Sequence, residues 1–157
     1  MFLPDSEFAN VISGAPLVSI DLIVKNDQGE VLLGKRHNKP AKGYWFVPGG
    51  RIRKNERSRD ALSRIAQGEL GITATQGKLL GVFDHFYDDN VFGMPGFGTH
   101  YVALGYQLEL SCTSRISPDA QHTELTWWSI AHLLASEEVH QNTKLYFNEA
   151  ASCDRLV

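Results

Sequence analysis

The segment 49–72, GGRIRKNERSRDALSRIAQGELGI, restricts the fold and chemistry of this chain more than any other. Two glycines open it, a helix is predicted over 56–70, and Gly71 follows. The apolar side chains of this helix share one arc of the helical wheel, and Glu69 falls in the middle of that arc. A carboxylate on a buried face is costly unless it is paired or bound to a metal. Glu69 is therefore either a helix-end residue that meets water or an arginine, or a ligand of a hard cation such as Mg²⁺.

Strands are predicted on both sides of this helix. The expected strands are 17–24, 31–36, 43–48, 79–86, 100–110 and 124–129. A short helix is expected to end at Gly14, a helical turn to begin in 131–135, and a final helix to span 137–150. This arrangement predicts an α+β sandwich with a mixed sheet. With 157 residues, the whole chain 1–157 is expected to form one domain.

Charge and composition exclude several classes of partner. The net charge of −3 and the absence of a basic tract argue against a nucleic acid polymer, but not against a small anionic ligand. No segment approaches the roughly 20 apolar residues that cross a bilayer, and the start lacks the pattern of a signal peptide. Cys112 and Cys153 show no metal-type or redox-type spacing, which indicates thiols in a reducing compartment, the cytoplasm.

The segment 49–72 resembles the Nudix box, whose pattern is G-x5-E-x7-R-E-U-x-E-E-x-G-U, where U is aliphatic. The matching residues are Gly50, Glu56, Arg64, Glu69, Gly71 and Ile72. The resemblance implies a Nudix-type α/β/α sandwich with a mixed β-sheet. It also implies that nucleoside diphosphate derivatives bind through Mg²⁺ or Mn²⁺ held on this loop, helix and loop.

Two places of the box depart from the family pattern. Where the family carries two further metal-binding glutamates, this chain has Ile65 and Gly68. The remaining carboxylates are too few for a cluster of several cations. The departures are compatible with a degenerate, non-enzymatic module or with a changed mechanism.

Beyond the box, the chain resembles the GDP-mannose mannosyl hydrolase branch of the Nudix family. The resemblance rests on PLVSIDLIV, LLGKR, GYWFVPGGR, GVFDHFYDDN, THYVALGY and DAQH. It implies hydrolysis of GDP-mannose, and also of GDP-glucose, to GDP and free sugar. Water attacks the anomeric carbon with inversion, and GDP leaves. The branch also implies a homodimer. Attack at carbon explains the departures in the box, because one cation and a few fixed positive charges suffice for the leaving diphosphate.

The resemblance assigns one Mg²⁺ to three ligands, with Mn²⁺ as an alternative ion. They are the carboxylate of Glu69, the backbone carbonyl of Gly49 and the side-chain oxygen of Gln121. His122, which follows Gln121, is the expected catalytic base, because imidazole titrates near neutrality. Taken alone, Gln121 and His122 would be ordinary loop residues.

Two further residues are expected at the sugar and are counted with the catalytic groups. Asp21 interrupts an apolar strand and is expected to stabilise positive charge on the sugar ring, although strand alternation would equally place it on a polar face. His85 is expected to contact substrate or to support the base. The segment 87–98 contains three glycines and is expected either to close over the substrate or to form an ordinary hairpin loop.

Arg36 and Arg51 are expected to bind the diphosphate, with Arg36 also acting in catalysis, because a guanidinium forks onto phosphate oxygens and stays charged. Tyr101 is expected to reach the diphosphate or the metal. Arg64 is expected to hold the loop of the box by hydrogen bonds, and Glu56 to form a structural salt bridge.

Three functions remain open at this point. The first is the metal-dependent hydrolysis of a GDP-sugar at the sugar carbon. The second is a conventional Nudix hydrolase that attacks phosphorus in another nucleoside diphosphate derivative. The third is a nucleotide-sugar-binding module without turnover. Labelled water distinguishes the first two, because the label enters the sugar in one reaction and phosphate in the other.

Overall fold

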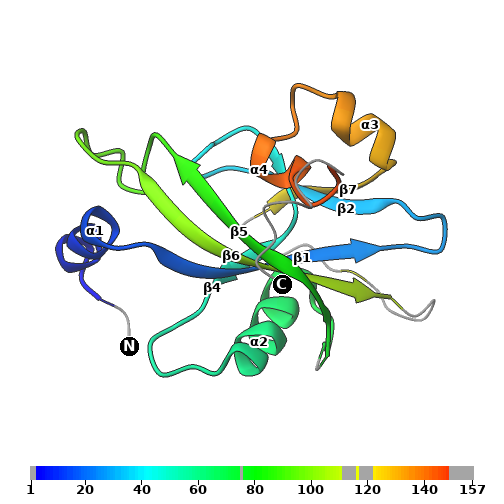
Figure 1. Ribbon diagram of the computed structural model, residues 1–157, viewed down its shortest axis with the longest axis horizontal. Coiled ribbons are helices and arrows are strands. Elements are labelled where there is room, and N and C mark those ends of the chain that lie inside the picture. Colours follow the sequence, from blue (N-terminus) through cyan, green and yellow to red (C-terminus); the bar gives the residue numbers. More distant parts are fainter. Residues whose placement is uncertain (1–2, 75, 111–115, 117–121, 149–157) are drawn as a thin grey trace.

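The computed structural model describes residues 3–74, 76–110, 116 and 122–148. The elements in chain order are α1 (Asp5–Gly14), β1 (Leu17–Lys25), β2 (Val31–Arg36), β3 (Trp45–Phe46), β4 (Gly49–Arg51), α2 (Ser58–Leu70), β5 (Lys78–Tyr87), β6 (Thr99–Glu109), β7 (His122–Trp128), α3 (Ile130–Ala135) and α4 (Gln141–Lys144). Within the described residues the strands form one sheet, with α2 on one side and α3 and α4 on the other (Figure 1).

The sheet is mixed, as predicted. Its main path runs β3-β2-β1-β6-β5, with β4 paired to β1 and β7 paired to β2. The central pair β1 and β6 is parallel, whereas the other ladders are antiparallel. The predicted α+β sandwich with a mixed sheet is confirmed.

Strand alternation divides the core between the two faces of the sheet. Ile20, Leu22 and Val24 of β1 pack with the apolar arc of α2, while Ile23 packs with residues near α3 and α4. Because successive side chains of a strand point to opposite faces, Asp21 lies on the face of Ile23, away from α2. The charge that interrupts β1 therefore belongs to the same layer as the C-terminal helices.

The helix of the box begins two residues later than predicted and ends as expected. Gly71 follows its last residue with φ of 68°, and its N–H donates to carbonyls of the last turn. Glycine adopts this left-handed conformation without a steric penalty, so it ends the helix efficiently. Of the predicted strand 43–48, only β3 is a strand, and a further short strand, β4, follows after Val47 and Pro48.

The prediction of a helix over 137–150 is wrong for the described residues of that range. Helix α4 covers only Gln141–Lys144, with Nδ1 of His140 accepting from the N–H of Asn142 at its start. Before it, the chain bonds to β3: Trp45 N–H donates to Glu138 O, and His140 N–H donates to Trp45 O. Val139 forms a parallel bridge to Trp45 and is almost fully buried. Pairing with the edge of β3 overrides helix propensity here.

In the part of the chain that the structure describes, no helix combines the length and hydropathy needed to cross a membrane.

Candidate active site

A cavity of about 120 Å³ opens where β1, β4, β5 and β6 meet the end of β2. Its lining residues are Ser19, Asp21, Arg36, His37, Asn38, Phe46, Val47, Gly49, Gly50, Arg51, His85, Tyr87 and Tyr101. Six of the predicted site residues are among them: Asp21, Arg36, Gly49, Arg51, His85 and Tyr101. Ligand pockets usually measure about 300–1,000 Å³, so this cavity is smaller than most and holds only part of a ligand of that size.

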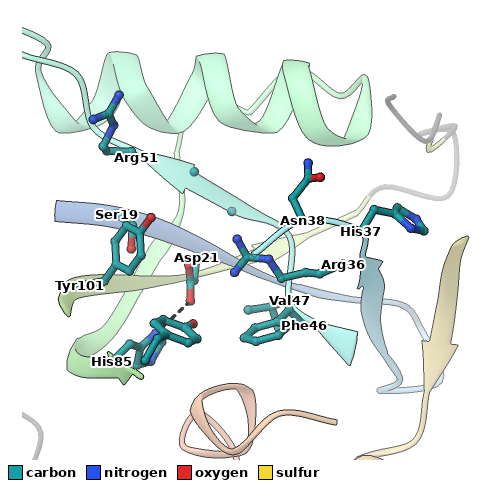
Figure 2. A pocket seen from close by; sticks show the side chains of 13 residues that line it. Ser19, Asp21, Arg36, His37, Asn38, Phe46, Val47, Arg51, His85 and Tyr101 are labelled. Atoms are coloured by element: carbon teal, nitrogen blue, oxygen red, sulfur yellow. Dashed lines mark ion pairs between the residues drawn. The ribbon is translucent and has the colours of Figure 1, made fainter. Parts of the chain in front are cut away.

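Asp21 stands at the centre of the cavity (Figure 2). Its Oδ2 accepts a hydrogen bond of 2.7 Å from the hydroxyl of Tyr146 and lies 3.8 Å from Nδ1 of His85. Burial raises the pKa of the Asp21 carboxyl, while His85, the Tyr146 hydroxyl and Arg36 act in the opposite direction. The site therefore holds a carboxylate whose charge depends on its neighbours.

His85 comes from β5 and is only 3% exposed. Burial lowers the pKa of its imidazole, against the opposing influence of Asp21 and Asp84, so the ring is neutral at pH 7. Among the described residues its Nε2 has no hydrogen-bond partner. Buried polar atoms normally have partners, so an unpartnered imidazole nitrogen in a residue that lines this cavity is unusual.

The two predicted arginines lie at different sides of the cavity. The Cζ of Arg36 lies 5.1 Å from the ring centroid of Phe46, and its guanidinium is directed toward Asp21 (Figure 2). The Cζ of Arg51 lies 4.0 Å from the ring centroid of Phe8, a residue of α1, and its side chain extends away from Asp21. Stacking on an aromatic face holds each guanidinium in place while leaving donors for anionic oxygens.

Two tyrosines complete the wall near β5 and β6. Tyr101 lies beside Ser19 in Figure 2, and burial raises the pKa of its phenol. Burial likewise raises the pKa of Tyr87 to about 12. Both phenols are therefore neutral at physiological pH and act as hydrogen-bond donors and acceptors.

The loop of the box is held by Arg64, as predicted. Its Nε and Nη2 donate to the two carboxylate oxygens of Glu56 at 2.6 and 2.8 Å, and Nη2 also donates to Arg51 O at 2.9 Å. Glu56 additionally accepts from the N–H of Arg53 at 2.9 Å. The Arg64 hydrogen bond is the main reason why the pKa of Glu56 falls to about 2. The predicted structural salt bridge is confirmed.

The register of β4 determines the direction of the Gly49 carbonyl. Leu22 N–H donates to Pro48 O and Ile52 N–H donates to Val18 O, so Asp21 and Gly49 form a non-hydrogen-bonded pair of the antiparallel ladder. The carbonyl of Gly49 therefore points away from β1. Two residues further on, the equivalent carbonyl of Arg51 accepts from Arg64 of α2.

Glu69 lies on α2 and is 8% exposed, so it is on the buried face that the helical wheel predicted. It is not among the residues that line the cavity. Carboxylate and backbone carbonyl oxygens are the donor types that a hard cation prefers, so Glu69 and Gly49 fit Mg²⁺ or Mn²⁺ by their chemistry.

The two departures from the box have different structural contexts. Ile65 is 2% exposed and belongs to the α2 core, where its Cγ1 would lie 3.2 Å from a Cβ at Gly50. A glutamate at this position would compete with core packing. Gly68 has open space around it. Within the described ranges, no three His, Cys, Asp or Glu side chains come together as a metal-binding group.

The remaining predicted ligand and the predicted base lie at the start of β7. Gln121 falls outside the described residues. The described part of His122 is its backbone, which is paired with Arg36 of β2. The pairing of β7 with β2 therefore brings the chain at His122 to the end of β2, where Arg36 lines the cavity.

The segment 87–98 is built around Asn90, which is fully buried. Its side-chain amide donates to Met94 O and Phe97 O, and its Oδ1 accepts from the N–H groups of Phe92 and Met94. All these bonds lie within the segment, so it has the internal order of a preformed loop.

Sequence analysis missed Tyr146, Tyr87, Ser19 and the aromatic partners Phe8 and Phe46. Ser19 had a usable signal, because it lies two residues before Asp21 and so faces the same side of β1. No pattern in the sequence points to Tyr146, because it is 125 positions from Asp21 in the chain.

A family model described as "NUDIX domain" matches residues 15–148. The chain belongs to the Nudix family. The match covers the whole sheet, the box and all described site residues, and the mixed sheet between helices agrees with it.

Among curated relatives, the low-salt glycan biosynthesis protein Agl8 of Haloferax volcanii is 44% identical over 124 residues, which are 78% of this chain and 77% of that protein. The ADP-ribose pyrophosphatase of Methanocaldococcus jannaschii is 37% identical over 68 residues, 43% of this chain and 40% of that protein. The crystal structure of a MutT protein from Methanosarcina mazei Go1 superposes with a TM-score of 0.71 at 21% identity, covering 88% of this chain and 95% of that one. This last similarity shows the fold.

Proposed function

We propose that this Nudix protein hydrolyses GDP-mannose, and also GDP-glucose, to GDP and the free sugar, with water attacking the anomeric carbon and inverting it. The observation that carries the proposal is the pairing of Asp21 with His85 in a cavity that also contains Arg36 and Arg51. A carboxylate stabilises positive charge on a sugar ring, and guanidinium groups stabilise a departing diphosphate.

The two arginines stabilise the leaving group. As the bond from the sugar to GDP breaks, negative charge gathers on the diphosphate. Arg36, directed into the cavity and held on Phe46, donates hydrogen bonds to this group, and Arg51 does so from the end of β4. Tyr101, a neutral phenol, donates a further hydrogen bond at the same end of the cavity.

The resident cation is Mg²⁺, with Mn²⁺ as a substitute, as is typical of Nudix hydrolases. Glu69, the carbonyl of Gly49 and the side chain of Gln121 would hold it. When bound, it supplies positive charge that makes GDP a better leaving group. The buried position of Glu69 on α2 and the direction of the Gly49 carbonyl away from β1 support this assignment.

Three residues act on the sugar and the attacking water: Asp21, His85 and His122. Asp21 lies beside the ring carbon and stabilises its developing positive charge. His85, which lines the cavity beside Asp21, contacts the sugar. His122 accepts the proton of the attacking water, because an imidazole is half-protonated near pH 6.5 and is an effective base at neutrality.

The relative Agl8 supports a substrate that contains a sugar. Its name assigns that protein to glycan biosynthesis, and the similarity extends over 78% of this chain. Nucleotide sugars are the activated donors from which glycans are made, so hydrolysis of one would adjust its supply. The GDP-mannose hydrolase branch further implies a homodimer, which analytical ultracentrifugation at several protein concentrations tests.

Hydrolysis in water enriched in ¹⁸O tests the reaction. The protein is incubated with GDP-mannose and Mg²⁺, and both products are analysed by mass spectrometry. The expected result is ¹⁸O in the free mannose and none in GDP. The anomer released first, followed by proton NMR, should be inverted relative to the substrate. Label found in phosphate groups with unlabelled sugar would overturn the proposal.

A second candidate is hydrolysis at phosphorus. The 37% identity to an ADP-ribose pyrophosphatase over 68 residues favours it, because that protein's name describes cleavage of a pyrophosphate. This reaction would release sugar 1-phosphate and place the label in phosphate. Tight binding of GDP-mannose without any product would instead indicate a binding module.

A further inference from the structure

We infer that Tyr146, which does not line the cavity, is a positioning residue that holds the carboxylate of Asp21 in its working orientation. The inference rests on the proposed function only for the role of Asp21. It assigns a task to a residue that neither the sequence pattern nor the lining of the cavity indicates.

The hydrogen bond between the two side chains is short and buried. The hydroxyl of Tyr146 donates to Oδ2 of Asp21 at 2.7 Å, and Tyr146 is 4% exposed. A hydrogen bond to a charged acceptor in a buried environment is stronger than one in water. The bond therefore fixes which oxygen faces Tyr146 and His85 and which faces β4.

The other oxygen of Asp21 is confined by Gly49. A Cβ at Gly49 would lie 2.6 Å from Oδ1 of Asp21. The carboxylate is thus held between the hydroxyl of Tyr146 on one side and the backbone of β4 on the other. Such a group is oriented before the substrate arrives, which is what electrostatic stabilisation of a transition state requires.

The sheet leaves room for Tyr146 at one particular position. Gly105 of β6 lies beside Asp21 in the parallel register of β1 and β6. A Cβ at Gly105 would lie 2.6 Å from Cε1 of Tyr146 and 3.1 Å from its Cδ1. The absence of a side chain at Gly105 therefore lets the ring lie against β6 and reach Asp21.

The ring of Tyr146 is also fixed by its neighbours on β5. It makes edge-to-face contacts with Phe83 and His85, at centroid distances of 4.7 and 5.8 Å. These contacts persist if only the hydroxyl is removed. Tyr146→Phe therefore tests the hydrogen bond separately from the packing.

The first experiment compares initial rates of sugar release from GDP-mannose for the wild type and Tyr146→Phe. The kcat is expected to fall by about 10- to 100-fold, which corresponds to one lost hydrogen bond to a charged group, and KM to change less than threefold. Tyr106→Phe is the matched control, because Tyr106 packs on the α2 face of the sheet. An unchanged kcat, or a rise in KM alone, would overturn the inference.

A second variant reaches the same contact from the opposite strand. Gly105→Ala keeps the hydroxyl but displaces the ring, and it should lower kcat to a similar degree with little change in KM. A crystal structure of Tyr146→Phe should show the Asp21 carboxylate rotated from its wild-type orientation. An unrotated carboxylate together with a wild-type rate would contradict the inference.

A double-mutant cycle separates failure of this inference from failure of the proposed function. Urea unfolding midpoints of the wild type, Tyr146→Phe, Asp21→Ala and the double variant need no substrate. Removing the hydroxyl should lower the midpoint when Asp21 is present and lower it clearly less when Asp21 is absent. Equal shifts in both backgrounds would overturn the inference, whereas release of no sugar by the wild type would overturn only the proposed function.

Discussion

Gly49 and Asp21 face each other so closely that a single methyl group on Gly49 would lie 2.6 Å from Oδ1 of Asp21. The same methyl would lie 2.6 Å from the carbonyl oxygen of Ile20, which is backbone and has little freedom to move. A residue proposed as a carbonyl ligand of the cation therefore also shapes the space around the central carboxylate.

Gly49→Ala is expected to lower the free energy of unfolding by about 1–3 kcal/mol, because the added carbon overpacks β1 and β4. It should also lower the rate of hydrolysis, because Asp21 must move. Gly68→Ala is the matched control: its Cβ meets nothing within 4 Å and it lies within α2, so it should raise stability by about 0.5–1 kcal/mol. Urea unfolding measures the stability of both variants. Equal changes in their free energies of unfolding would contradict this prediction.

Glu56→Gln is expected to lower the free energy of unfolding by about 1–3 kcal/mol at pH 7, because Arg64 loses its charged acceptor. The pKa of Glu56 is about 2 in the folded chain, whereas a glutamate without these interactions has a pKa of 4.5. The carboxylate therefore stabilises the fold above pH 4.5, and this contribution is lost as pH falls toward 2.

Unfolding measured at pH 7, 4 and 2.5 checks this prediction. The stability difference between wild type and Glu56→Gln should shrink steadily over that range. Glu137→Gln, at an exposed position, is the control and should show little difference at any pH. A difference that stays constant down to pH 2.5 would mean that the charge of Glu56 is not what matters.

His140→Asn is expected to remove a pH-dependent loss of stability. Burial is the main reason why the pKa of His140 falls to about 4 from 6.5, and the nearby His85 and Arg36 act in the same direction. Between these values the unfolded chain takes up a proton that the folded chain does not, so the free energy of unfolding falls as pH drops from 6.5 to 4. Asparagine keeps an acceptor for the N–H of Asn142 but does not titrate.

The wild type should therefore lose more stability than His140→Asn between pH 7 and 4.5, as measured by urea unfolding. Proton NMR of the His140 ring gives the pKa directly. A midpoint near 6.5 in the folded protein would remove the basis of this prediction.

Glu69→Gln is expected to weaken Mg²⁺ binding by tenfold or more, because a neutral oxygen replaces the carboxylate on α2. Isothermal titration with Mg²⁺, or the electron paramagnetic resonance of bound Mn²⁺, measures the change. Asp60→Asn removes an exposed carboxylate from the first turn of the same helix and serves as the control. If both variants bind the cation as tightly as the wild type, Glu69 is not a ligand.

His122→Ala is expected to slow turnover by 100-fold or more while changing the affinity for Mg²⁺ less than threefold, as removal of a catalytic base requires. His132→Ala, in α3, controls for the loss of a histidine elsewhere in the chain. Steady-state kinetics and metal titration on the same samples give the comparison. A parallel loss of turnover and of metal binding would assign His122 to the metal site instead of the proton transfer.

The local parts of the site could be predicted from the sequence because their partners are close along the chain. Glu56 and Arg64 are eight positions apart, and the loop and helix between them bring them together. Glu69 on the buried arc of α2 followed from helical periodicity alone. The end of the helix at Gly71 followed from the conformational freedom of glycine.

The final helix was the clearest failure. The sequence 137–150 has helical propensity, but the segment before α4 pairs with β3 through Trp45. A hydrogen bond to a strand 90 or so positions earlier leaves no periodic signal, because propensity describes only neighbours in the chain.

The sequence by itself determined the box, the mixed α+β sandwich and the residue types of the proposed chemistry, because periodicity and short-range spacing are written along the chain. Only the tertiary structure decided that Asp21 meets His85 and Tyr146, and that Gly105 admits the tyrosine ring. These contacts depend on the register of paired strands and on the packing of distant segments. A change of one residue in the register of β1 would turn Asp21 to the opposite face.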